Sequence, residues 1–115
     1  MIQIYHNSRC GKSRNCLTFI EKSGVEFETI NYLVEKPTFD KLSEIIKKLE
    51  IKPIDLIRKK EKIWIDNYKK LILSDKEIIQ AMIDNPILIE RPIIVNRNRA
   101  IIAREINKIE AFFMI

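Results

Sequence analysis

The sequence lacks the features of a secreted or membrane-bound protein. It has only two cysteines in 115 residues, too few for a disulfide framework, and this fits a reducing cytoplasm. It has no apolar run of about eighteen residues, and it does not open with a basic leader and an apolar segment. It also lacks internal repeats, low-complexity tracts and linkers. We therefore expect a cytoplasmic protein with no membrane partner, folded as a single domain over residues 1–115.

The composition that remains is that of a globular protein. Apolar residues make up 46% of the chain and charged residues 32%, which favours a soluble core-forming fold over disorder. The formal net charge is +5. This charge favours an anionic partner but does not choose between nucleic acid, acidic protein and a small oxyanion.

The segment from Tyr5 to Asn15 carries the candidate chemistry. A strand pattern over residues 2–5 precedes it, and a helical pattern that ends near Gly24 follows it. Cys10 is therefore predicted at a strand-to-helix turn, where the helix dipole and free N–H groups favour a thiolate or a bound oxyanion. The dipole alone leaves a thiol titrating near neutrality, so full thiolate character needs nearby positive charge from His6, Arg9, Lys12 or Arg14. The alternative is a buried apolar cysteine.

The hydrophobic pattern predicts the other elements. A second strand over residues 25–30 would pair in parallel with the first through a right-handed βαβ crossover. A helical insertion is expected at about 37–85, a hairpin over 93–103, and a final helix over 106–113. This order predicts an α/β fold, a mixed four-stranded sheet with helices on both faces.

The helical insertion contains two signals for the start of a helix and, between them, a stretch that is harder to interpret. Ser74 to Glu77 form a capping box, and Thr38 is the candidate N-cap of an earlier helix. Between them lie apolar residues that we interpret as packing residues rather than a platform for stacking bases: Ile63, Trp64, Tyr68, Leu71 and Ile72. No nucleic-acid partner is expected.

Residue spacing argues against three other sites. A phosphatase-type loop needs an arginine six residues after the nucleophile, where this chain has Cys16. A dithiol site needs a second cysteine at the position of Ser13. A zinc site from His6, Cys10 and Cys16 would have three ligands at non-standard spacing. We therefore expect no metal and a single essential thiol, with Cys16 as a packing residue.

Three blocks of sequence resemble the glutaredoxin-coupled arsenate reductase family, whose fold is thioredoxin/glutaredoxin-like. They are His6-Asn7-x-x-Cys10-Gly11-x-Ser13-Arg14-Asn15, Arg58-Lys59, and Asn85-Pro86-Ile87-Leu88-Ile89-x-Arg91-Pro92-Ile93-x-Val95. The resemblance runs from the first predicted strand through Arg104. It implies a cytoplasmic arsenate reductase that binds no cofactor, uses glutathione as co-substrate and has glutaredoxin as partner.

The resemblance also implies roles for individual residues. Cys10 would be the nucleophile, and the oxyanion ligands would be Arg58, Arg91 and Arg104. His6 corresponds to a histidine thought to help lower the thiol pKa, and the supporting residues would be Asn7, Gly11, Ser13, Arg14 and Pro92. The bond between Arg91 and Pro92 is expected to be cis. The chain departs from the family at Glu105, where a proline usually follows the third arginine.

Two other functions fit the same fold. Spx-type regulators share it and the Arg-Pro-Ile block, and they act by binding RNA polymerase. They usually carry two cysteines in Cys-x-x-Cys and lack an arginine at the place of Arg104, so this chain looks more like the enzymes. A related thiol reductase acting on another oxyanion, or on a glutathione mixed disulfide, is the other alternative.

Overall fold

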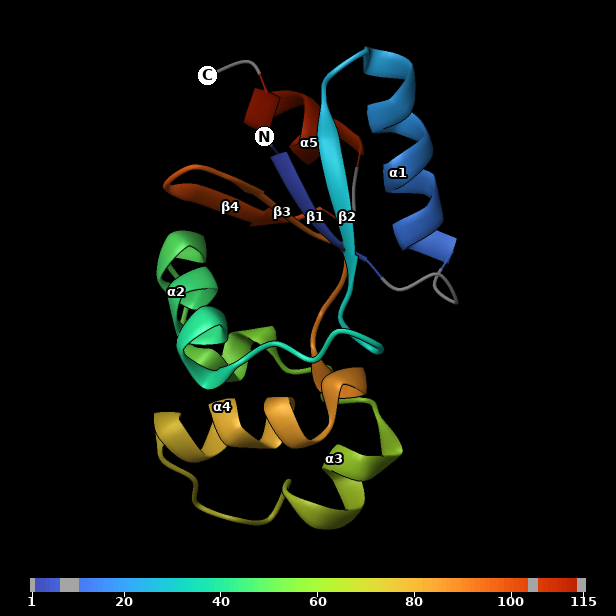
Figure 1. Cartoon of the computed structure of the whole chain (residues 1–115). Helices are drawn as coiled ribbons and strands as arrows, with labels where there is room; N and C mark the ends of the chain where they lie inside the picture. The colour runs from blue at the N-terminus through green and yellow to red at the C-terminus, as the bar shows by residue number, and fades with distance from the viewer. Residues whose placement is uncertain (1, 7–10, 104–105, 114–115) are drawn as a thin grey trace. The chain divides into compact units, whose positions relative to one another are not determined.

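The computed structural model describes residues 2–6, 11–103 and 106–113 (Figure 1). The chain divides into two compact units, one formed by Met1–Glu35 with Arg91–Ile115 and the other by Lys36–Glu90. The second unit contains the segment expected as a helical insertion, and each unit is described by itself. Whether the two behave as a single domain stays a prediction. In the parts of the chain that the structure describes, no helix has the length and apolar character needed to cross a membrane.

The first unit is built on a mixed four-stranded sheet. Its elements are β1 (Ile2–His6), α1 (Gly11–Ser23), β2 (Phe27–Asn31), β3 (Ile93–Asn96), β4 (Arg99–Ile102) and α5 (Ile106–Phe113). The strands lie in the order β2-β1-β3-β4, with β1 parallel to β2 and antiparallel to β3, and with β3 antiparallel to β4. The parallel β1-α1-β2 crossover and the returning hairpin are those predicted from the sequence.

One face of this sheet is covered by α1 and α5. Alternate residues of β1 point to that face, and the helices contribute residues spaced three and four apart. The resulting buried cluster consists of Ile2, Ile4, Cys16, Ile20, Ile94, Ala103, Ile109 and Phe112. Burial of each large aliphatic side chain contributes about 1.5–3 kcal/mol, so this cluster fixes β1 against α1 and α5.

The helix α1 ends where the sequence predicts, at Gly24. This residue has φ +78°, and its N–H donates to the carbonyl of Glu21 at 3.3 Å. A Cβ atom at this position would meet nothing within 4 Å. The left-handed backbone conformation, rather than a shortage of space, is therefore what favours glycine here.

The second unit is helical. Its elements are α2 (Phe39–Leu49), the 3-10 turn η1 (Pro53–Leu56), α3 (Lys62–Asn67), α4 (Asp75–Asp84) and the 3-10 turn η2 (Pro86–Leu88). Thr38 Oγ1 accepts from the N–H of Lys41 at 3.1 Å and caps α2. Ser74 Oγ accepts from the N–H of Glu77 at 3.2 Å, and Glu77 Oε1 accepts from the N–H of Ser74 at 3.0 Å. Both predicted caps are confirmed.

The prediction for the stretch before α4 is partly wrong. Trp64 is buried and stacks on Tyr68 with ring centroids 5.6 Å apart, as expected of packing residues. Ile63, Leu71 and Ile72 are instead exposed, Ile72 completely. Ile63 lies on the face of α3 away from its one buried residue, Trp64. For Leu71 and Ile72 the cause is the length of α3: the helix ends at Asn67, so the helical spacing that suggested a buried stripe does not continue through the turn that follows.

Candidate functional site

The predicted nucleophile lies between two well-defined elements. Strand β1 ends at His6, and α1 begins at Gly11. Cys10 and Asn7 fall outside the described residues, so the reactivity of Cys10 stays a prediction. The residues on either side are the last of a strand and the first of a helix, which is the setting that the sequence predicted. The backbone of Ser13 belongs to the first turn of α1.

Arg14 brings positive charge to the start of α1. Its Nη2 lies 3.8 Å from the position that a Cβ atom on Gly11 would take. The side chain therefore runs back toward the helix N-terminus, as helical side chains tend to do. Apart from the chain neighbours of Gly11 and the backbone of its own helix, no other atom of the described residues lies within 4 Å of that Cβ position, so a side chain at Gly11 would make only ordinary van der Waals contact.

His6 is almost fully buried at the end of β1, with 9% of its surface exposed. Among the described residues, its Nδ1 has no hydrogen-bond partner. Burial, and then the charge of Arg14, lower the pKa of the imidazole below its ordinary 6.5. The ring is therefore neutral at pH 7. A neutral ring can stabilise a nearby thiolate only as a hydrogen-bond donor, so His6 adds no positive charge here, whereas Arg14 does. The role that the resemblance gives to His6 stays a prediction.

Cys16 is a packing residue, as predicted. It is 2% exposed and belongs to the cluster between α1 and the sheet. Burial raises the pKa of its thiol to about 11. A thiol with such a pKa is almost entirely protonated at neutral pH, so Cys16 lacks the thiolate that nucleophilic chemistry requires.

Arg58 follows η1 and is fixed by its backbone. Its N–H donates to the carbonyl of Leu88 at 2.7 Å, and its carbonyl accepts from the N–H of Glu61 at 3.1 Å. The neighbouring residues Ile57 and Ile89 form an antiparallel bridge, and the N–H of Glu90 donates to the carbonyl of Leu56 at 2.9 Å. A short two-stranded ladder thus holds Arg58 beside the segment that leads to Arg91.

The guanidinium of Arg58 lies near two carboxylates. Nη1 is 3.6 Å from Oε1 of Glu61, and Nε is 3.9 Å from Oε1 of Glu90. The three side chains are partly buried, with exposures of 26%, 29% and 16% for Arg58, Glu61 and Glu90. Glu61 follows Arg58 by three residues in the chain, whereas Glu90 is brought near Arg58 by the ladder.

Arg91 and Pro92 precede β3 in the first unit. The peptide bond between them is cis, which confirms the prediction made from the resemblance. The carbonyl of Pro92 accepts from the N–H of Ala103 at 2.8 Å. Arg104, the next residue after Ala103, lies outside the described residues. The hydrogen bond nevertheless joins the two residues that adjoin the predicted ligands Arg91 and Arg104.

The strand register connects this pair to the Cys10 segment. Tyr5 of β1 pairs with Ile93 of β3. His6 and Pro92 are the next residues along these two antiparallel strands. Within the first unit, the start of the Cys10 segment therefore lies beside the cis-proline, in line with the supporting role expected of Pro92.

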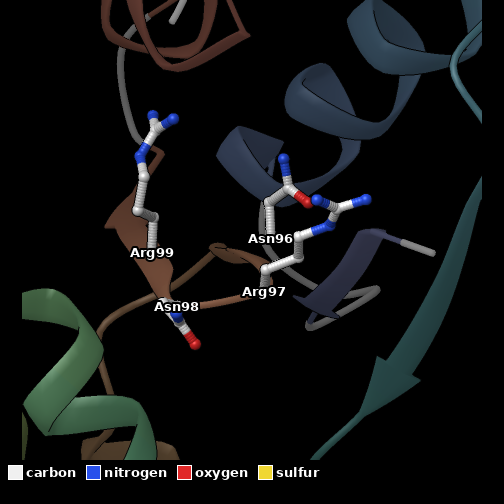
Figure 2. Close-up of a pocket in the computed structure, with 4 residues that line it drawn as sticks. All are labelled: Asn96, Arg97, Asn98 and Arg99. Atoms are coloured by element: carbon white, nitrogen blue, oxygen red, sulfur yellow. The ribbon is translucent and has the colours of Figure 1, made fainter.

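A hollow of about 400 Å³ at the tip of the β3–β4 hairpin was not expected from the sequence (Figure 2). It is lined by Asn96, Arg97, Asn98 and Arg99. Arg99 extends away from Arg97 in Figure 2 and donates through Nη2 to the carbonyl of Phe112 at 2.8 Å. Its guanidinium also lies 4.5 Å from the centroid of the Phe112 ring. Arg99 therefore holds α5 against β4, and none of the four residues that line the hollow is a predicted site residue.

Comparison with known proteins agrees with these features. The model of the ArsC family matches residues 5–112. This chain belongs to the ArsC family. It is 40% identical over 105 residues to the uncharacterised Escherichia coli protein YfgD, with 90% of this chain and 88% of YfgD covered. It is 41% identical over 99 residues to an Escherichia coli arsenate reductase, with 82% of this chain and 67% of that protein covered.

The solved structure of an arsenate reductase from Vibrio cholerae has the same fold. It superposes with a TM-score of 0.90 at 32% identity, covering 96% of this chain and 95% of that one. The predicted α/β, thioredoxin-like fold class is thus confirmed. The ArsC match includes the positions of Cys10, Arg58, Arg91 and Arg104. Their convergence on one anion site stays a prediction, because two of the four lie outside the described residues and Arg58 belongs to the other unit.

Proposed function

We propose that this ArsC-family protein is a cytoplasmic arsenate reductase that uses Cys10 as nucleophile and takes electrons from glutathione and glutaredoxin. The observation that carries the proposal is the family match over nearly the whole chain, together with 41% identity to an arsenate reductase. The helix that begins at Gly11, the residue after Cys10, supports a thiol site of the thioredoxin type.

The proposed reaction has three steps. The Cys10 thiolate attacks arsenic, so that an S–As bond forms, an As–O bond breaks and the oxygen leaves as water after protonation. Glutathione thiolate then attacks the Cys10 sulfur. An S–S bond forms, and the S–As electron pair stays on arsenic, which is reduced from As(V) to As(III) and leaves as arsenite. A glutaredoxin thiolate finally attacks the glutathione sulfur and releases Cys10 as thiolate.

The helix α1 and Arg14 support the first step. The N-terminus of α1 carries partial positive charge, and Arg14 adds a full charge beside Gly11. Both favour a thiolate at the preceding residue and the approach of an anion. His6, being neutral at pH 7, would contribute by hydrogen bonding and not by charge.

Contacts of neighbouring residues support arginine ligands for the oxyanion. Ala103, which precedes Arg104, is hydrogen-bonded to Pro92, which follows Arg91. Arg58 is ion-paired to Glu90, which precedes Arg91. Guanidinium groups stay charged and donate in a planar fork, which suits a tetrahedral oxyanion and the charge that develops during transfer.

The test is a coupled assay with arsenate, glutathione and glutaredoxin, with arsenite measured as product. The wild-type chain should turn over, Cys10→Ser should be inactive, and Cys16→Ala should retain activity as the matched thiol control. Absence of arsenite formation by folded wild-type protein would refute the proposal. Turnover that needs glutathione but not glutaredoxin would leave arsenate reduction intact and remove glutaredoxin as partner.

A further inference from the structure

The carboxylates of Glu61 and Glu90 lie beside Arg58 and indicate that its side chain is held in one orientation. We propose that Glu90, assisted by Glu61, is a positioning residue that holds the guanidinium of Arg58 near Nε and Nη1, so that its remaining N–H donors are directed to the oxyanion. The proposal rests on the proposed function, because it assigns Arg58 the role of oxyanion ligand. It adds two residues, Glu61 and Glu90, to the predicted site.

Backbone hydrogen bonds fix Arg58, Glu61 and Glu90 in place. Arg58 is hydrogen-bonded on both sides, through its N–H to Leu88 and through its carbonyl to Glu61, at 2.7 and 3.1 Å. Glu90 is fixed in the same ladder by its N–H bond to Leu56 at 2.9 Å. Because the three backbones are tied together, the three side chains lose less freedom when they pair than long side chains on an open surface would.

Local secondary structure does not require the side chains of Glu61 and Glu90 to lie near Arg58. Glu61 stands at the N-cap of α3, yet its side chain makes no capping hydrogen bond and lies near Arg58 instead. The Glu90 carboxylate is only 16% exposed. By contrast, the Lys62–Asp66 pair of α3, at 3.7 Å, is 88% and 52% exposed, as expected of an ordinary surface pair.

The geometry leaves part of the guanidinium for a ligand. The group has five N–H donors in a fixed fork. The two carboxylates lie near Nε and Nη1, and Nη1 is buried without a hydrogen bond among the described residues. Contacts at these two nitrogens fix the plane of the guanidinium and thereby the direction of its remaining N–H donors, as an ordered contact to an oxyanion requires.

Negative charge beside an anion site also has an opposing effect. Each carboxylate repels a bound oxyanion and offsets part of the arginine's charge. If repulsion dominated, removal of Glu90 would tighten anion binding. If orientation dominates, as we propose, removal of Glu90 weakens binding, and an uncharged residue of the same shape restores it. The two effects therefore differ in sign.

The experiment measures arsenate affinity by calorimetry in a Cys10→Ser background, where no covalent adduct can form. Glu90→Ala should weaken binding about tenfold, the lower end of what loss of an orienting partner costs a metal ligand. Glu90→Gln, which keeps the shape and an acceptor oxygen, should stay within about twofold of the parent. Asp66→Ala serves as the matched control and should leave the affinity unchanged. Tighter or unchanged binding in Glu90→Ala would overturn the proposal.

A second readout distinguishes orientation from loss of fold. The Nε–H signal of Arg58 in a ¹⁵N NMR spectrum, assigned by its absence in Arg58→Lys, should be sharp in the parent. It should broaden in Glu90→Ala while the backbone amide spectrum stays dispersed. A sharp, unshifted Nε–H signal in Glu90→Ala would overturn the positioning role. A parent protein that binds no arsenate at all would instead refute Arg58 as an oxyanion ligand. This outcome distinguishes failure of the proposed function from failure of the positioning role alone.

Discussion

The carbonyl of Pro92 accepts a hydrogen bond from the N–H of Ala103 at 2.8 Å. This bond joins the entrance of β3 to the exit of β4, beyond the last paired residues of the hairpin, Ile93 and Ile102. Arg91 precedes one partner, and Arg104 follows the other. The bond therefore holds Pro92 beside Ala103, and each of these residues is next in the chain to a predicted oxyanion ligand.

The two cysteines should differ sharply in reactivity. Cys10 is predicted beside the positive N-terminus of α1, whereas Cys16 is buried with its thiol pKa raised to about 11. Brief treatment with iodoacetamide at pH 7 should therefore alkylate Cys10 alone, and Cys16 should react only after unfolding. Peptide mass spectrometry reads both sites in one sample. Modification of Cys16 before Cys10 in the folded protein would contradict the assignment.

His6 should make the stability of the protein depend on pH. Its pKa is lowered on folding, so the unfolded chain binds the proton more readily than the folded protein. The stabilisation is complete above the unfolded pKa of about 6.5 and is lost as the pH falls through the lower folded value. Urea unfolding should therefore give a smaller free energy of unfolding at about pH 5.5 than at pH 7.5.

The matched variant for this pH effect is His6→Asn. The chain has a single histidine, so its imidazole signal can be followed by NMR without assignment. The signal should titrate below pH 6.5, and His6→Asn should lose most of the difference in stability between the two pH values. An imidazole that titrates above 6.5 would contradict the neutral ring and would restore His6 as a source of positive charge.

The cap of α4 should contribute measurably to stability. Ser74 and Glu77 exchange two hydrogen bonds at 3.2 and 3.0 Å. Ser74→Ala leaves helix N–H groups without this acceptor and should lower the free energy of unfolding by about 1 kcal/mol. Ser43→Ala within α2 is the control, because alanine is favoured inside a helix. Equal effects of the two substitutions in urea unfolding would argue against the cap.

Local signals in the sequence were enough to locate the caps, the parallel β1-α1-β2 unit, the returning hairpin and the start of α1. The Ser74 box needs residues only three apart, and the β1-α1-β2 unit follows from alternation and handedness rules. The exposure of Ile72 could not be predicted, because it depends on where the short helix α3 ends. Nor could the pairing of Arg58 with Glu90, since a tertiary ladder rather than sequence spacing makes them neighbours.

The residue after Arg104 should modulate anion binding. Glu105 places a carboxylate where the family usually has proline. A negative charge beside a bound oxyanion is unfavourable, so Glu105→Gln should lower the KM for arsenate with little change in kcat. Glu26→Gln, an exposed substitution between α1 and β2, controls for the change in net charge. The effect should shrink as salt is raised, and a rise in KM would show that Glu105 assists binding instead.

Loss of any one predicted arginine ligand should impair turnover far more than stability. A hydrogen bond to a charged group is worth about 1.5–3 kcal/mol, so Arg91→Ala or Arg104→Ala should each lower kcat/KM about 10- to 100-fold. Arg97→Asn is the control: Arg97 lies exposed at the hairpin tip with φ +58°, a conformation that asparagine tolerates. Sulfate should compete with arsenate in the parent and less strongly in the two alanine variants. If Arg97→Asn impaired turnover as much as these two, net charge rather than a specific anion site would govern activity.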